Sequence, residues 1–145
     1  MTIDDDIRLN EPIRHIDLKP HPWWSLKTKG SERRIPLVSV ALWAAERIVD
    51  DRTRQFAIPR YCNEQVCNAN SASNELNKWL HQKVSNQFVM HSLRRSLRDR
   101  LRAVECPTEV VDAIGGWQVA TVGQGYGDSY PLEVLLVWLM KIKLS

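Results

Sequence analysis

The sequence predicts a single α+β domain that is mainly α, with a small antiparallel sheet near the N-terminus followed by a helical bundle. Two observations support this class. Short apolar runs separated by turn residues occupy positions 13 to 37, and apolar residues recur at helical spacing from Ser39 onward. A length of 145 residues fits one domain that spans the chain from 1 to 145.

The expected sheet lies within residues 13 to 37. Ile13, Ile16 and Leu18 form a short apolar run, and Lys29-Gly30-Ser31 supplies the residue types of a turn. The segment Arg34-Ile35-Pro36-Leu37 then re-enters as an edge strand, a position in which proline is tolerated.

Two helices are expected next, separated by a polar connection. The first covers residues 39 to 50 and the second residues 72 to 84, whereas residues 53 to 70 contain Pro59 and have room for one short helix. The apolar residues at helical spacing are Val40, Trp43, Ala44 and Ile48 in the first helix, and Leu76, Trp79, Leu80 and Val84 in the second.

Three more helices complete the expected bundle. They cover residues 91 to 104, the segment from Pro107 to the stop at Gly115-Gly116, and a last segment that begins near Pro131. About ten of the fourteen residues from Pro131 to Leu144 are apolar, too many for a one-sided helix. This last helix therefore either folds onto its own core or docks into a neighbouring subunit.

Composition predicts an intracellular protein without a membrane segment. The start, MTIDDDIR, is acidic where a secretory signal is basic, and the apolar run Leu132–Leu144 spans about 13 residues against the roughly 20 of a membrane helix. Cys62, Cys67 and Cys106 lack the paired spacing of a zinc site, so we expect reduced thiols and no metal.

The helix expected at 91 to 104 concentrates positive charge. Residues 91–102 carry a local charge of about +4, whereas the whole chain sums to +3. His91, Arg94, Arg95, Arg98 and Arg102 fall within an arc of about 100°, and Leu93, Leu97, Leu101 and Val104 occupy another. Arg94 lies at the border, so we expect it to be half-buried with an oxyanion partner. A merely solvated basic face is the alternative interpretation.

Three further patterns accompany this helix. His91-Ser92-Leu93-Arg94 is an H-x-x-R, Gly115-Gly116-Trp117 follows, and Tyr126 comes nine residues after Trp117. Upstream, residues 25–37 read SLKTKGSERRIPL. In this order and spacing they resemble the catalytic domain of the tyrosine recombinases, the phage integrase family, whose hairpin reads K-T-K-x-S-x-R-x-(I/V)-P-L. The resemblance covers about residues 7 to 143.

The resemblance implies a role for each residue in cutting a phosphodiester. Arg94 and Trp117 donate hydrogen bonds to phosphate oxygens, and His91 donates to the phosphate or accepts the tyrosine proton. Tyr126 attacks and leaves a 3'-phosphotyrosine link, Lys29 protonates the departing 5'-oxygen, and Lys27 and Arg95 contact DNA. No metal ion or other cofactor is implied.

Several of these assignments have competitors in the sequence. Lys27 is an alternative to Lys29 as the hairpin lysine, although Lys29 precedes the turn glycine as in the family. Tyr130 competes with Tyr126, which the spacing from Trp117 favours. Lys29 as an ordinary turn residue, His91 as a helix cap and Trp117 as a core residue are the plainer readings.

The family also needs an R-x-x-E on a helix before the sheet, and here the chain departs from the pattern. Arg8-Leu9-Asn10-Glu11 matches those letters, but Pro12 cannot continue such a helix. We therefore expect this motif and the N-terminal DNA-clamping domain to lie outside the chain, and its activity to be impaired.

The resemblance also sets the expected partners and the alternatives. They are double-stranded DNA attachment sites and, in the full-length protein, a tetramer on DNA, within the cytoplasmic nucleoid. A DNA-binding relic of an integrase, or a type IB topoisomerase-like domain, is the alternative function.

Overall fold

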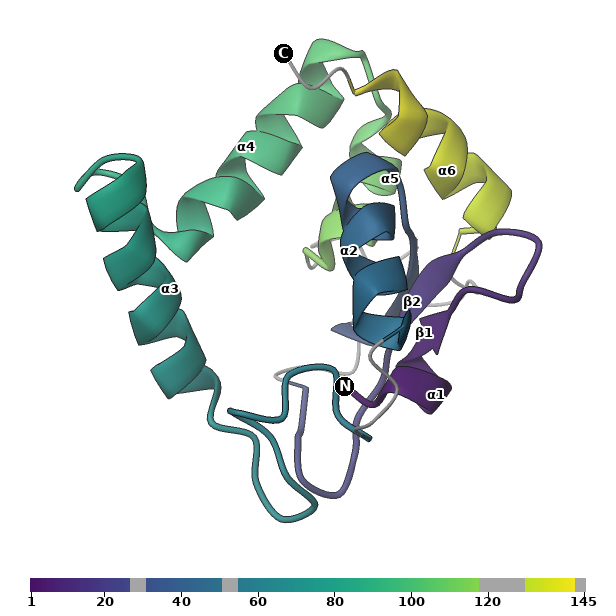
Figure 1. The fold of residues 1–145 in the computed structure, drawn as a ribbon. Helices are drawn as coiled ribbons and strands as arrows, with labels where there is room; N and C mark the ends of the chain where they lie inside the picture. The colour runs from purple at the N-terminus through teal and green to yellow at the C-terminus, as the bar shows by residue number, and fades with distance from the viewer. Residues whose placement is uncertain (27–30, 51–54, 118–129, 143–145) are drawn as a thin grey trace.

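The computed structural model describes residues 1–26, 31–50, 55–117 and 130–142, and its fold is α+β and mainly helical, as the sequence predicts (Figure 1). The elements in chain order are α1 (Ile3–Asp6), β1 (Ile7–Arg8), β2 (His15–Leu18), β3 (Arg33–Pro36), α2 (Ser39–Asp50), α3 (Ala69–Lys83), α4 (Met90–Ala103), α5 (Thr108–Gly115) and α6 (Leu132–Lys141). The sequence pattern did not reveal α1 and β1, because elements of four and two residues are too short for a period to appear.

The three strands form one antiparallel sheet in the order β1-β2-β3. Ile16 of β2 pairs with Ile35 of β3, and Asp17 pairs with Arg34. Because side chains alternate along a strand, Arg33 shares the face of Ile16 and Ile35, whereas Arg34 lies on the opposite face with Asp17. The adjacent residues Arg33 and Arg34 therefore belong to two different surfaces.

The helices follow the expected order, and capping explains where their starts differ. α2 spans the expected residues 39 to 50, and α4 differs from its expected bounds by one residue at each end. α3 begins three residues early because the side chain of Asn68 accepts a hydrogen bond from the backbone N–H of Ser71, at 3.1 Å. Asn77 of α3 in turn accepts from the N–H of Met90, at 2.7 Å, which ties α3 to the start of α4.

The main core lies where α4, α5 and α6 meet. Leu101, Val111, Ile114 and Leu135 are almost completely buried there, and Ile35 of β3 packs against them. A second, smaller core joins the sheet to α2 through Ile7, Leu37 and Ala45. The C-terminal end of α5 lies beside β3, and the candidate site forms there together with the Arg94–Arg98 stretch of α4.

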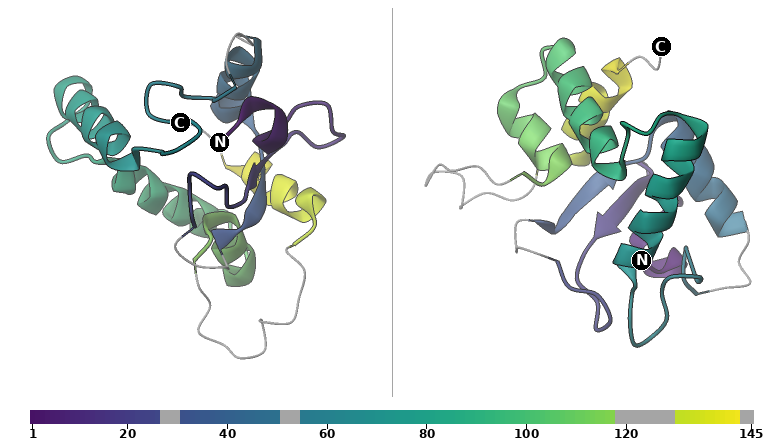
Figure 2. Two further views of the ribbon diagram at one scale, coloured as in Figure 1. Left: turned by 90° about the horizontal axis from the view of Figure 1, so that it is seen from below. Right: turned by 90° about the vertical axis from the view of Figure 1, so that its left-hand side faces the viewer.

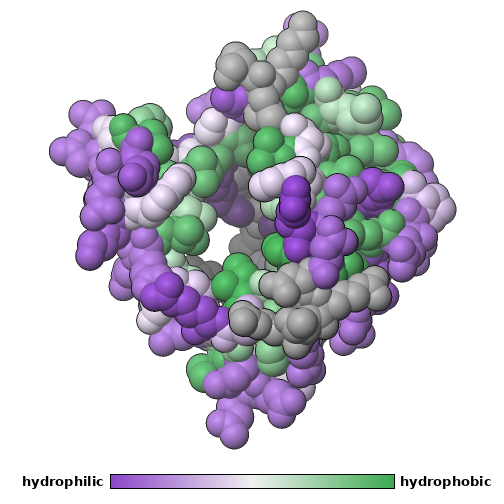
Figure 3. Space-filling model, in the orientation of Figure 1, coloured by the Kyte–Doolittle hydropathy of each residue, from purple (hydrophilic) through white to green (hydrophobic). Residues whose placement is uncertain are grey.

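α3 and the start of α4 extend away from these cores (Figures 1 and 2). Leu80 is buried, but Trp79 and Leu93 are more than half exposed, so the apolar faces expected of these helices are only partly covered. Helical spacing identifies which residues share a face, and it carries no information on whether another element covers that face. Hydrophobic residues line part of the rim of an opening beside these helices (Figure 3).

The C-terminal helix packs on the core of its own chain. Leu135 and Leu139 of α6 are buried in the main core, while Val137 and Met140 point outward and are more than half exposed. Of the two arrangements left open by the sequence, the structure thus has the helix folded back in cis. In the part of the chain that the structure describes, no helix is long and apolar enough to cross a membrane.

The expectation that all cysteines are reduced is wrong for two of them. Cys62 and Cys67 form a disulfide within the connection between α2 and α3, and Cys106 is a buried free thiol. The side chain of Asn63 accepts hydrogen bonds from the N–H groups of Gln65 and Val66, both at 2.9 Å, and this turn brings the two cysteine Cα atoms to 4.2 Å. The pairing depends on that local turn, which cysteine spacing does not predict.

Candidate functional site

The candidate site begins at the Gly115-Gly116-Trp117 turn that ends α5. Gly116 has a left-handed backbone with φ of 61°, and its N–H and that of Trp117 both donate to the carbonyl of Asp112. A side chain at Gly115 would overlap the Trp117 ring, and one at Gly116 would overlap the guanidinium of Arg33. Both glycines are therefore needed to fold Trp117 back over the end of α5.

Arg94 of α4 lies against the Trp117 ring. Its guanidinium carbon is 4.5 Å from the ring centroid, and that of Arg98, one turn further along α4, is 5.0 Å away. Both distances fit cation–π contacts. The expected convergence of Arg94 and Trp117 is present, but within the described residues the partner of Arg94 is an aromatic ring rather than an oxyanion.

A buried carboxylate lies behind the arginines. Asp112 of α5 is 8% exposed, and its Oδ1 is 3.6 Å from a terminal nitrogen of Arg98, longer than a direct hydrogen bond. Within the described residues, this Oδ1 atom and the Arg98 Nε are buried without a hydrogen-bond partner. The pair therefore compensates part of the positive charge and leaves polar groups unsatisfied.

Arg33 of β3 reaches the same place from the sheet. Its Nε donates to the Ile114 carbonyl at 3.1 Å, and a terminal nitrogen donates to the Ser31 carbonyl at 2.8 Å. Burial, together with the nearby positive charge of Arg94, lowers the pKa of the Arg33 guanidinium. Arg33 is not among the site residues that the sequence predicts, although strand alternation from Ile35 is the signal that places it on the helix-facing side.

The resulting cluster has an excess of positive charge. Arg94 and Arg98 stack on the Trp117 ring, and the Arg33 guanidinium lies at the adjacent Gly116, close enough to Arg94 for the two charges to interact. Among the described residues, the Asp112 carboxylate lies beside Arg98. Partial burial makes the electrostatic interactions of each guanidinium stronger than they would be in water. Planar guanidiniums with several N–H donors match the geometry of phosphate oxygens, so the arrangement suits an oxyanion.

The other predicted residues fall into two groups. His91 lies in the first turn of α4, one turn before Arg94, and is exposed, as is Arg95. Lys27, Lys29 and Tyr126 lie outside the described residues. The structure therefore brings Arg94 and Trp117 together, carries His91 and Arg95 on the same helix as Arg94, and does not test the lysines or the tyrosine nucleophile.

Tyr130, the rival of Tyr126, lies at the far end of α5. Its hydroxyl donates to Glu109 at 2.8 Å, and this hydrogen bond raises the pKa of the Tyr130 phenol. Glu109 is in the first turn of α5, whereas Trp117 follows its last turn, so the two ends are separated by about 10 Å at 1.5 Å per residue. Tyr130 is therefore poorly placed to attack a phosphate beside Arg94.

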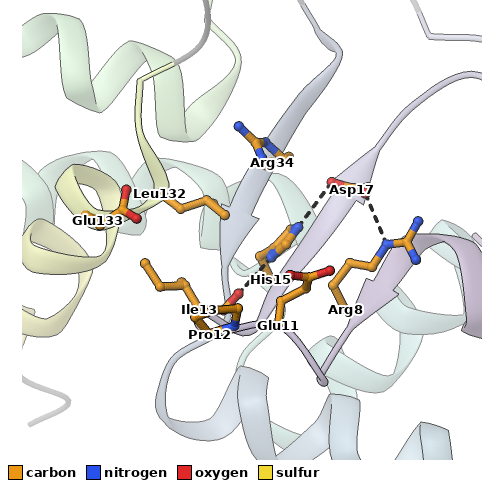
Figure 4. Close-up of a pocket in the computed structure, with 9 residues that line it drawn as sticks. All are labelled: Arg8, Glu11, Pro12, Ile13, His15, Asp17, Arg34, Leu132 and Glu133. Carbon is orange, nitrogen blue, oxygen red and sulfur yellow. Dashed lines mark hydrogen bonds and ion pairs between the residues drawn. The ribbon is translucent and has the colours of Figure 1, made fainter.

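Arg8 and Glu11 lie on the other face of the sheet from this cluster. They line a pocket of about 450 Å³ into which Arg34 also projects (Figure 4). Within it, Asp17 is 3.4 Å from both Arg8 and His15, and Arg8 belongs to a strand rather than a helix. These residues therefore do not reproduce the helical R-x-x-E motif, as Pro12 indicated.

Comparisons with protein-family models, with curated protein sequences and with solved structures give no match for this chain. Among the described residues, no group of three or more His, Cys, Asp or Glu side chains is placed to hold a metal ion. A function must therefore be inferred from the residues themselves and from the geometry of the arginine cluster.

Proposed function

We propose that this chain is the catalytic domain of a tyrosine-type site-specific recombinase, which cleaves and rejoins DNA through a 3'-phosphotyrosine intermediate. The observation that carries the proposal is the stacking of Arg94 and Arg98 on Trp117, with the Arg33 guanidinium at the adjacent Gly116 and the Asp112 carboxylate beside Arg98. An excess of half-buried guanidiniums suits a phosphodiester, whose transition state gathers further negative charge.

In this proposal the arginine cluster holds the phosphate while other residues transfer protons. The Tyr126 oxygen attacks phosphorus and gives its proton to His91, and the bond to the 5'-oxygen breaks as Lys29 protonates it. Trp117 stacks against Arg94 through its ring and offers its indole N–H to a phosphate oxygen. Arg95, exposed on α4, and Lys27 contact the flanking DNA backbone.

The same proposal sets the partners and the place of action. Its ligand is a double-stranded DNA attachment site, on which the protein acts as a homo-oligomer, a tetramer on DNA. Since the substrate is chromosomal or prophage DNA, the protein belongs in the cytoplasm with the nucleoid. We expect weak activity because Arg8 lies on the far face of the sheet, and the lack of one charge-stabilising donor costs about 10²- to 10³-fold in rate.

A catalytically inactive DNA-binding relic is the second candidate. It is favoured by the place of Arg8, which pairs with Asp17 on the far face of the sheet and cannot add its charge to the cluster. The relic and the enzyme both bind DNA with an affinity that falls as salt rises. Only the enzyme forms a covalent adduct.

The decisive experiment traps that adduct. The chain is incubated with nicked duplexes of randomised sequence, from which a short 5'-hydroxyl strand diffuses away after cleavage, and covalent products are separated under denaturing conditions. We expect a low yield of adduct that disappears in Tyr126→Phe and persists in the matched variant Tyr130→Phe. Adduct formation by Tyr126→Phe would refute the mechanism, and DNA binding without any adduct would establish the relic.

A further inference from the structure

Arg33 is held in a fixed orientation by the backbone around it. Its bonds to the carbonyls of Ile114 and Ser31 use two of the five N–H groups of the guanidinium. Ile114 is 81 residues away in the chain, so this contact joins β3 to the C-terminal end of α5. The Arg33 side chain is therefore ordered before any ligand arrives.

Among the described residues, the hydrogen bonds of Arg33 include no counter-ion. Both acceptors are neutral carbonyl oxygens, which satisfy N–H groups without cancelling a full charge. In the described part of the chain, the charged neighbour that acts on Arg33 is Arg94, which has the same sign. Two half-buried guanidiniums that are close enough to repel each other are stabilised when an anion binds to both.

We propose that Arg33 is a second phosphate-binding arginine, which holds one phosphodiester group of DNA together with Arg94. This inference rests on the proposed function, because it takes the same phosphate as its ligand. Arg33 would supply from the sheet the guanidinium that Arg8 cannot supply from the opposite face. The plainer alternative is that Arg33 only fastens β3 to α5.

Salt dependence of DNA binding separates the two roles. Each neutralised phosphate adds about 0.9 to the slope of log affinity against log salt. Removing one of two arginines that share a phosphate should therefore make the loss of affinity between 50 and 200 mM salt smaller, by up to about 3.5-fold. We expect this change for Arg33→Gln, measured by fluorescence anisotropy with labelled duplex DNA. The matched control is Arg34→Gln, which removes the neighbouring charge on the opposite face and should keep the wild-type slope. A wild-type slope for Arg33→Gln, or an equal change in the control, would overturn the proposal.

A measurement on the unmodified chain covers the case in which Arg33→Gln fails to fold. Inorganic phosphate is titrated into isotope-labelled protein, and the Nε–H resonances of arginine side chains are followed by NMR. The resonances of Arg33 and Arg94 should shift together with one dissociation constant. A shift of Arg94 without Arg33 would contradict a shared ligand.

Arg94→Gln distinguishes failure of this inference from failure of the proposed function. If the wild-type chain does not bind DNA, or Arg94→Gln keeps the wild-type slope, the phosphate site itself is wrong and the role of Arg33 falls with it. If Arg94→Gln lowers the slope and Arg33→Gln does not, the site stands and Arg33 is only a structural link.

Discussion

Replacing Gly116 with alanine tests whether the turn after α5 and the placement of Arg33 depend on one missing side chain. Gly116 has φ of 61°, and a Cβ atom there would overlap the Arg33 guanidinium. An alanine in the left-handed region costs about 1–2 kcal/mol. If Arg33 is displaced, the hydrogen bond from its Nε to Ile114 is lost as well.

The size of the effect follows from these two terms. A hydrogen bond made by a charged group contributes about 1.5–3 kcal/mol, and we take about 1–2 kcal/mol here because Arg33 is only half-buried. Gly116→Ala should therefore lower the free energy of unfolding by about 2–4 kcal/mol, a large part of the roughly 5–15 kcal/mol of a typical domain.

A double-mutant cycle isolates the contact between the two residues. Arg33→Met alone should cost about 1–2 kcal/mol, and in that background Gly116→Ala should cost only its backbone term of about 1–2 kcal/mol. The coupling energy is then about 1–2 kcal/mol. Urea unfolding followed by circular dichroism measures all four proteins. Additive losses would refute the idea that a side chain at Gly116 displaces Arg33.

Two further predictions concern Trp117 and Cys106. Trp117→Phe keeps an aromatic ring beneath Arg94 but removes the indole N–H. The rate of adduct formation should therefore fall by about 10²-fold, while the affinity for duplex DNA changes little. An unchanged single-turnover rate would exclude the indole N–H as a phosphate donor. Burial raises the pKa of the Cys106 thiol above its value in the unfolded chain. The neutral thiol therefore contributes fully to the free energy of unfolding at neutral pH, and this contribution is lost as the pH rises from the unfolded pKa, near about 8.5, through the higher folded pKa. Urea unfolding at several pH values should show that Cys106→Val weakens this alkaline decline, and an identical pH profile in the variant would count against it.

Local patterns predicted much of the helical part because they are repeated within a few residues. The bounds of α2 and α4 agree with the apolar spacing, and the Gly115-Gly116 stop agrees with a left-handed helix end. The border position of Arg94 on α4 follows from the helical period alone, and its half-buried state in the structure agrees with it. The exposure of Trp79 and Leu93 could not be predicted in this way, because it depends on which elements pack against α3 and α4.

The amino-acid sequence by itself determined the fold class, the order of the main elements and the pairing of Arg94 with Trp117 as a candidate site. Only the tertiary structure decided that Arg33 joins them, that Arg8 does not, and that α6 packs on its own chain. The physical reason is distance along the chain. Helix capping and the helical period act over a few residues, whereas the sheet register and the meeting of β3 with α5 depend on the burial of apolar surface shared between remote segments.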